Sequence, residues 1–129
     1  MPLKVLVADD NEVVRSSIVR MLKENPDVEV VGESINYAQT LELTATLKPD
    51  VLLLDLLMPD DGAYAPGEIK QHLLHNAACI LAISVWNNDE ASQRAENLGA
   101  KALLDKANLY GDLNRWIRNL CNPGRASGL

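Results

Sequence analysis

Apolar and polar positions divide the chain into two kinds of segment. Short runs of aliphatic and β-branched residues recur between longer stretches in which apolar residues return with helical spacing. Runs that are apolar at every position are typical of strands covered on both faces, as in a parallel sheet. The predicted strands are Val5–Ala8, Val28–Val31, Val51–Leu54, Ile80–Ile83 and Ala102–Leu104.

Five stretches with helical spacing alternate with these strands. Three of them end where a helix is disfavoured, at Asn25-Pro26, before Pro49 and at Leu98-Gly99. The predicted helices are a first with Val14, Ile18, Met21 and Leu22 on one face, a second with Ala38, Leu41 and Ala45, a third around Glu68 to His75, a fourth from about Asn88, and a fifth with Leu109, Leu113, Trp116, Ile117 and Leu120. Strict alternation predicts an α/β fold of the flavodoxin-like type, with a doubly wound five-stranded parallel sheet of order 2-1-3-4-5 in a single domain.

Length and charge narrow the classes of protein that fit. The 129 residues suit one domain, placed at residues 1–121, followed by a linker-like segment at residues 122–129. No apolar run is long enough for a signal peptide or a bilayer-spanning helix, so we expect a cytoplasmic protein without membrane contact. A net charge of -6 with scattered Lys and Arg argues against direct nucleic-acid binding by this chain.

The two cysteines do not form a recognisable motif. Cys79 lies in an apolar run and Cys121 near the C-terminus, without the spacing of a redox pair or a zinc site. We therefore expect both to be thiols.

Polar side chains follow four of the five predicted strands. In a doubly wound sheet, ligands bind at the carboxyl ends of the strands, where the winding reverses. These ends lead into Asp9-Asp10, Asp55, Ser84, and Asp105-Lys106. Three carboxylates brought together would repel one another unless a cation lay among them. Oxygen ligands without a converging histidine or thiolate favour Mg²⁺, for which Mn²⁺ could substitute.

A carboxylate can itself attack phosphorus and form an acyl phosphate, provided that a metal and a fixed cation offset the charge. Asp55, at the end of a central strand, is the best candidate for this phosphoacceptor. Asp9 and Asp10 would hold the metal, Lys106 would pair with one phosphoryl oxygen, and Ser84 would donate a hydrogen bond to another. Taken singly, such residues are more typical of helix caps, turns and solvated charges, but the joint pattern favours a site.

Several motifs together resemble the receiver domains of bacterial two-component response regulators over nearly the whole chain. They are Val5-Leu-Val-Ala-Asp-Asp10, Pro49-Asp-Val-Leu-Leu-Leu-Asp-Leu-Leu-Met-Pro59, Ser84 after an apolar strand, and Gly99-Ala100 leading to Lys106. The resemblance implies that Asp9, Asp10 and Asp55 bind Mg²⁺, and that Leu57 adds its backbone carbonyl. It also implies that a sensor histidine kinase phosphorylates Asp55, in a signalling module rather than an enzyme.

Within that family, one motif narrows the resemblance. The stretch Asp27-Val-Glu-Val-Val-Gly-Glu-Ser34, with no proline after Lys106, looks like the receivers of LuxR/NarL-type transcription regulators. Such regulators carry a DNA-binding output downstream, which would be missing from this chain. The family would signal through the face of the fourth helix, fifth strand and fifth helix. A homodimer through that face, or through the first and fifth helices, is a candidate assembly.

Three features depart from the family pattern. The aromatic residue expected three positions before the lysine is Leu103. The expected proline after the lysine is Ala107, which should keep a trans peptide bond because a cis bond without proline costs about 3 kcal/mol. The segment from Met58 to Gly67 is longer before its helix. By the same resemblance Leu57 and Trp86 flank the path of the hydrolytic water, and we hypothesise that they slow loss of the phosphoryl group.

Other polar residues are expected to have ordinary roles. His72 and His75 lie in a predicted surface helix and should be solvated, and Asp60 and Asp61 are typical turn residues beside Gly62.

Two other functions stay open. A metal-dependent phosphatase of the haloacid dehalogenase type also uses a strand-end aspartate, but it needs Asp-x-Asp and a longer chain, whereas Asp9 and Asp10 are adjacent. A pseudo-receiver that binds partners without phosphorylation is suggested by Leu103 and Ala107. Intact Asp55 and Lys106 oppose that interpretation.

Overall fold

Five parallel strands in the order β2-β1-β3-β4-β5 form the sheet of the computed structural model, which describes residues 2–121. The predicted linker-like segment, residues 122–129, lies outside the described residues. The strands are β1 (Leu3–Ala8), β2 (Val28–Ser34), β3 (Val51–Asp55), β4 (Cys79–Ser84) and β5 (Ala102–Asp105). The helices are α1 (Glu12–Lys23), α2 (Tyr37–Leu47), α3 (Pro66–Asn76), α4 (Asp89–Asn97) and α5 (Leu109–Leu120), with 3-10 turns η1 (Asp61–Ala63) and η2 (Lys106–Asn108). The predicted fold class and strand order are confirmed.

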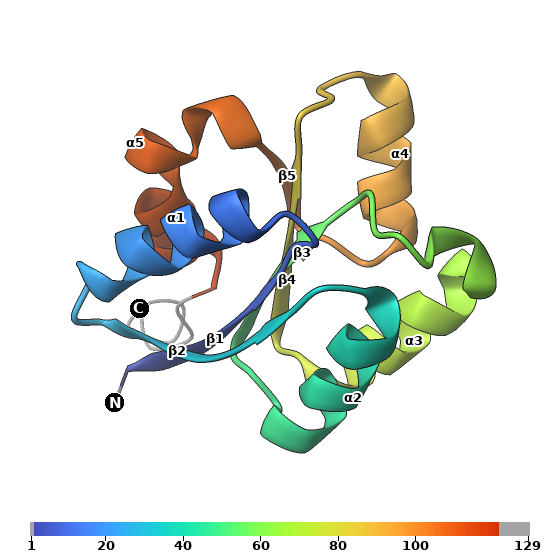
Figure 1. Ribbon diagram of the computed structural model, residues 1–129, viewed down its shortest axis with the longest axis horizontal. Coiled ribbons are helices and arrows are strands. Elements are labelled where there is room, and N and C mark those ends of the chain that lie inside the picture. The colour runs from blue at the N-terminus through green and yellow to red at the C-terminus, as the bar shows by residue number, and fades with distance from the viewer. Residues whose placement is uncertain (1, 122–129) are drawn as a thin grey trace.

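Helices cover both faces of the sheet (Figure 1). On one face α1 and α5 bury Ile18, Leu22 and Ile117 against a core that includes Leu53 of β3. On the other face α2, α3 and α4 enclose a second core that includes Leu52. Successive strand residues point to opposite faces, so burial on both sides explains why the central strands are apolar at every position. None of the helices within residues 2–121 is long and apolar enough to cross a bilayer.

The second strand, β2, is longer than the predicted Val28–Val31. Its last three residues pair with Leu6–Ala8 of β1, after a register shift between Val5 and Leu6. Pairing with a buried neighbour therefore continues through Gly-Glu-Ser, which has little intrinsic strand preference. The extension also supports the edge of the sheet, because the Asp9 N–H donates to the Ser34 carbonyl at 3.0 Å.

Local sequence determines where several helices begin. The side chains of Asn11, Asn36 and Asn88 cap α1, α2 and α4, each accepting a hydrogen bond from the N–H three residues later. The third helix starts at Pro66, two residues before the predicted Glu68, because proline suits the first helical position, where no intrahelical hydrogen bond is lost.

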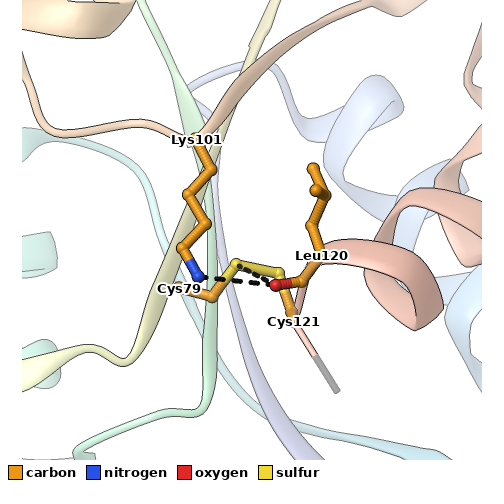
Figure 2. The surroundings of a disulfide bond; sticks show 4 residues. All are labelled: Cys79, Lys101, Leu120 and Cys121. Carbon is orange, nitrogen blue, oxygen red and sulfur yellow. Dashed lines mark hydrogen bonds between the residues drawn. A yellow bond between two sulfur atoms is a disulfide. The ribbon is translucent and has the colours of Figure 1, made fainter. Parts of the chain in front are cut away.

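The two cysteines form a disulfide, so the expectation of two thiols was wrong. Cys79 begins β4 and Cys121 follows α5, and their Cα atoms lie 5.6 Å apart although 42 positions separate them in sequence. Figure 2 shows Lys101 beside the bond, with its Nζ donating to the Leu120 carbonyl at 3.4 Å. The crossover topology creates this proximity, because it returns the end of α5 to the start of β4, and sequence spacing alone does not reveal it.

Candidate functional site

The carboxyl ends of four strands bring polar side chains to one edge of the sheet. Asp9 follows β1, Asp55 ends β3, Ser84 ends β4, and Lys106 opens η2 directly after β5. Because β3 lies between β1 and β4, Asp55 has a strand end on either side. The structure therefore brings together the side chains that the sequence analysis selected.

Three carboxylates form an acidic group at this edge. Asp9, Asp10 and Asp55 each place an oxygen within 4.8 Å of the others. Asp9 is fully buried and Asp55 is 3% exposed, whereas Asp10 is open to solvent. Among the described residues, the buried Asp9 Oδ2 has an ion pair with Lys106 at 2.9 Å but no aligned hydrogen bond. These carboxylate oxygens fit a hard divalent cation such as Mg²⁺, which could enter from the solvent side, where Asp10 lies.

Lys106 supplies the positive charge of the site. Its Nζ lies 2.9 Å from Asp9 Oδ2 and 3.3 Å from Asp55 Oδ1, and its side chain is 13% exposed. Burial by itself would lower the pKa of this ammonium, but the carboxylates of Asp9 and Asp55 outweigh burial and raise that pKa. Lys106 is therefore a permanent cation between the two aspartates.

Asp55 has the strongly perturbed carboxyl of the site. Burial raises its pKa to about 7, and the negative charge of Asp9 adds to the rise. The charge of Lys106 and a hydrogen bond from the Leu57 N–H oppose the rise without cancelling it. The single ammonium of Lys106 thus does not neutralise the three carboxylates, and the remaining negative charge would favour binding of a further cation.

Residues 5–118 match the response regulator receiver domain family. The chain belongs to this family. The response regulator protein VraR of Staphylococcus saprophyticus is 35% identical over 123 residues, covering 95% of this chain and 58% of the relative. The protein-glutamate methylesterase/protein-glutamine glutaminase 3 of Myxococcus xanthus is 33% identical, over 94% of this chain and 35% of its own.

A solved structure agrees with these relatives. The receiver domain of the putative response regulator NarL of Mycobacterium tuberculosis superposes with a TM-score of 0.81 at 30% identity, covering 93% of this chain and 96% of that one. The predicted likeness to LuxR/NarL-type receivers is supported. Receiver domains of this family are signalling domains, and the methylesterase shows that one can occur in an enzyme. This receiver spans between a third and three fifths of the length of these two curated relatives.

Two further groups lie near Asp55 in the receiver. The Leu57 N–H donates to Asp55 Oδ1 at 3.2 Å, while the predicted metal contact of the Leu57 carbonyl stays a prediction. Ser84 is buried, and its Oγ accepts a hydrogen bond from the Trp86 N–H at 2.9 Å, which leaves the hydroxyl proton to be donated. A cavity of about 350 Å³ adjoins Ser84 and is also lined by Leu57, Trp86 and Arg94.

The departures of the receiver from its family have visible consequences. Leu103 packs against the core beneath α2, α3 and α4, so an aliphatic group occupies the position of the expected ring. No cis peptide bond occurs in residues 2–121, so the trans bond predicted for Ala107 is confirmed. The longer segment after Met58 contains η1 before α3 begins.

Asp60 has a role that the sequence analysis missed. Its carboxylate accepts hydrogen bonds from the N–H groups of Tyr37 and Ala38, at 2.8 and 3.0 Å, in the first turn of α2. A carboxylate at a helix N-terminus satisfies unpaired donors and interacts favourably with the helix dipole. Asp60 thus joins the loop that follows Asp55 to α2. No local signal could indicate this role, because the helix lies 23 residues earlier in the chain.

Two more residues support the receiver from outside the site. Arg15 donates to the Asp9 carbonyl at 2.8 Å and forms an ion pair with Glu33 at 3.0 Å, which holds the end of β1 against β2. His72 was predicted to be solvated, and this was wrong. It is part-buried, and its Nε2 lies 2.8 Å from the Leu41 carbonyl, a contact that joins α3 to α2. His75 is exposed, as predicted.

Proposed function

We propose that this receiver accepts a phosphoryl group on Asp55 from a sensor histidine kinase in a reaction that requires Mg²⁺ or, as a substitute, Mn²⁺. One observation carries the proposal: a buried carboxylate with a pKa raised to about 7 lies 3.3 Å from an ammonium and within a group of three aspartates. That arrangement suits a nucleophile that must approach an anionic phosphoryl group.

Each residue then has a defined task, and Asp55 has two, as nucleophile and as metal ligand. An Asp55 oxygen forms the bond to phosphorus as the bond from phosphorus to the donor histidine nitrogen breaks, and the electron pair leaves on that nitrogen. Lys106 pairs with one phosphoryl oxygen, and Ser84 donates its hydroxyl proton to another. Asp9, Asp10, Asp55 and the Leu57 carbonyl would hold the cation. When bound, the metal offsets negative charge on the phosphoryl oxygens.

The wider protein is also inferred from relatives. We propose that a longer protein links this receiver to a DNA-binding output of the LuxR/NarL type and that it acts in the cytoplasm. Signalling would use the α4-β5-α5 face, and a homodimer would form there or through α1 and α5. The methylesterase relative supports an enzymatic output as the second candidate. Sequencing the reading frame beyond Leu129 separates the two.

The metal requirement gives the first prediction. Trp86 is 58% exposed beside the site, so its fluorescence should change on adding Mg²⁺ and again on adding beryllofluoride, a phosphoryl mimic. Replacing Asp10 with asparagine should weaken Mg²⁺ binding at least about tenfold, because one charged ligand is lost. Fluorescence titration measures both changes, with Trp116 as a constant background.

The matched control is Asp27→Asn. It removes an exposed carboxylate just before the N-terminal end of β2, whereas the site lies at the carboxyl ends of the strands, so the titration should be unchanged. If neither Mg²⁺ nor beryllofluoride alters the fluorescence of the unsubstituted protein, and acetyl phosphate adds no mass, the pseudo-receiver is the better description.

Exposed apolar groups beside the acceptor give the second prediction. Leu57 and Trp86 are 50% and 58% exposed and line the same cavity as Ser84. A water that attacks the acyl phosphate must pass them, so Leu57→Asn together with Trp86→Ser should shorten the lifetime about tenfold, equal to about 1.4 kcal/mol in barrier height. Loss of the phosphoryl mass with time measures the decay.

Leu74→Asn is the matched control, because Leu74 is an equally exposed leucine (51%) on α3. Its lifetime should equal that of the unsubstituted protein. Equal lifetimes for the Leu57/Trp86 variant and this control would show that the two side chains do not exclude water.

A further inference from the structure

One peptide group connects the acceptor to two helices. The peptide between Leu56 and Leu57 presents its N–H to Asp55 Oδ1 at 3.2 Å. Its carbonyl accepts a hydrogen bond from Arg94 Nε of α4 at 3.0 Å and another from the Tyr37 hydroxyl of α2 at 3.4 Å. Because a peptide group is planar and rigid, its two ends cannot reorient independently.

The contacts on the carbonyl side are shielded from water. Tyr37 is fully buried, and Leu56 is 2% exposed. Burial raises the pKa of the Tyr37 phenol, while a hydrogen bond from Arg94 and the charge of Arg94 oppose the rise. Tyr37 and Arg94 therefore contact each other as well as the Leu56 carbonyl. In such surroundings hydrogen bonds are strong, and leaving one partner unpaired is costly.

The same segment is fixed on its other side. The Leu56 N–H donates to the Ile83 carbonyl of β4 at 3.2 Å, one residue before Ser84. Arg94 also lines the cavity that Ser84 and Trp86 border. A change in the orientation of the Leu56–Leu57 peptide would thus be transmitted to α4 through Arg94. Trp86, which lines the same cavity as Arg94, would report this change by its fluorescence.

We propose that Tyr37 and Arg94 are positioning residues that hold the Leu56–Leu57 peptide, thereby orient the Asp55 carboxylate, and couple occupancy of the site to α4. The inference rests on the proposed phosphorylation of Asp55. An Asp55 oxygen that is bonded to phosphorus carries less negative charge and is a weaker acceptor for the Leu57 N–H. The peptide can then reorient, which changes the hydrogen bond between Arg94 and the Leu56 carbonyl and thereby the position of α4.

The test compares beryllofluoride affinity, in the presence of Mg²⁺, across conservative variants of the full chain. Tyr37→Phe keeps the ring and removes the hydroxyl, and Arg94→Met keeps much of the stem and removes the guanidinium. Each should weaken beryllofluoride binding about 3- to 10-fold, as expected for the loss of one hydrogen bond. Fluorine NMR of bound beryllofluoride measures the affinity independently of tryptophan. Arg94→Lys, which keeps the charge but not the fork of donors, should restore only part of the affinity.

Two matched controls make the same chemical changes elsewhere. Tyr64→Phe alters a half-buried tyrosine in the loop before α3, and Arg115→Met alters an exposed arginine on α5 that pairs with Asp112. Both should bind beryllofluoride as the unsubstituted protein does.

The shared carbonyl makes a sharper prediction. Tyr37 and Arg94 act on one oxygen. The Tyr37→Phe/Arg94→Met double variant should therefore have the same beryllofluoride affinity as whichever single variant binds beryllofluoride less tightly. Losses that multiply in the double variant would contradict a common point of action. In Arg94→Met the change in Trp86 fluorescence per bound beryllofluoride should also be smaller, since the link to α4 is cut.

Failure of this inference can be told from failure of the proposed function. If the unsubstituted protein binds beryllofluoride and the variants lose only folding stability, with affinity and Trp86 response unchanged, Tyr37 and Arg94 are structural and the inference is overturned. If the unsubstituted protein does not bind beryllofluoride at all, the phosphoacceptor proposal fails and the inference falls with it.

Discussion

Replacing Asp55 with asparagine will abolish phosphorylation of this receiver by acetyl phosphate in the presence of Mg²⁺. Asp55 is the nucleophile in the proposed reaction, and an amide cannot form the acyl phosphate, so the loss should be complete rather than partial. Mass spectrometry of the intact protein measures it as the absence of the added phosphoryl group. Asp27→Asn, which lies away from the site, should gain the same mass as the unsubstituted protein. Phosphorylation of the Asp55 variant would show that another residue is the acceptor.

The same variant has an internal check on folding. In the metal-free protein the pKa of Asp55 lies near 7, against a usual value of 3.8, so the native state retains a proton that the unfolded chain loses in this window. The native state is therefore progressively destabilised as the pH rises from about 4 to 7, and the effect is complete above 7. Asp55→Asn removes it, so the metal-free variant should be more stable at pH 8 than the unsubstituted protein, by about 1 to 3 kcal/mol. A urea titration without metal checks that the inactive variant is folded.

Reducing the disulfide will lower the free energy of unfolding by about 3 to 4 kcal/mol. The bond closes a loop over a sequence separation of 42 residues, and a loop of this size removes a corresponding amount of conformational entropy from the unfolded chain. Urea unfolding of the oxidised protein, with and without a reductant, measures the difference. A reducing compartment would favour the two thiols, so this stabilisation belongs to the oxidised protein.

The control for reduction is the Cys79→Ala/Cys121→Ala variant, whose urea midpoint should not respond to the reductant. Detection of two free thiols in the native protein before any reductant is added would contradict the assignment of the bond. Equal midpoints for the unsubstituted protein in both conditions would show that the bond contributes nothing to stability.

The sheet was predictable because its signals are local. Apolar runs mark the buried strands, Asn25-Pro26, Pro49 and Leu98-Gly99 mark three helix ends, and the requirement for right-handed crossovers leaves few strand orders. The site residues were predictable for the same reason, since parallel strands deliver their carboxyl ends to one edge. What failed depends on pairs distant in sequence. The length of β2 depends on β1, the Cys79–Cys121 bond on the return of α5, and the contact of His72 on the packing of α3 against α2.

The supporting groups of the site were missed for a related reason. Tyr37 is an ordinary helix residue in sequence, and Arg94 reads as a surface charge, yet both reach the Leu56 carbonyl from elements that contain no site residue. Asp60 does read as a turn residue, and it lies in the connection between β3 and α3, but its partners are on α2. Strand-end patterns identify groups that can react. They do not identify the groups that orient them, because those contacts arise only when layers of the fold meet.

Because Asp60 caps α2, amide hydrogen exchange in α2 can detect opening of the loop between β3 and α3. The amide protons of Tyr37 and Ala38 are bonded to the Asp60 carboxylate, whereas that of Gln39 is bonded to Asn36 within the same turn. Detachment of the loop would expose the first two amides and leave the third protected. The ratio of their exchange rates therefore reports opening of the loop that follows Asp55, measured on a helix that carries none of the proposed reacting groups.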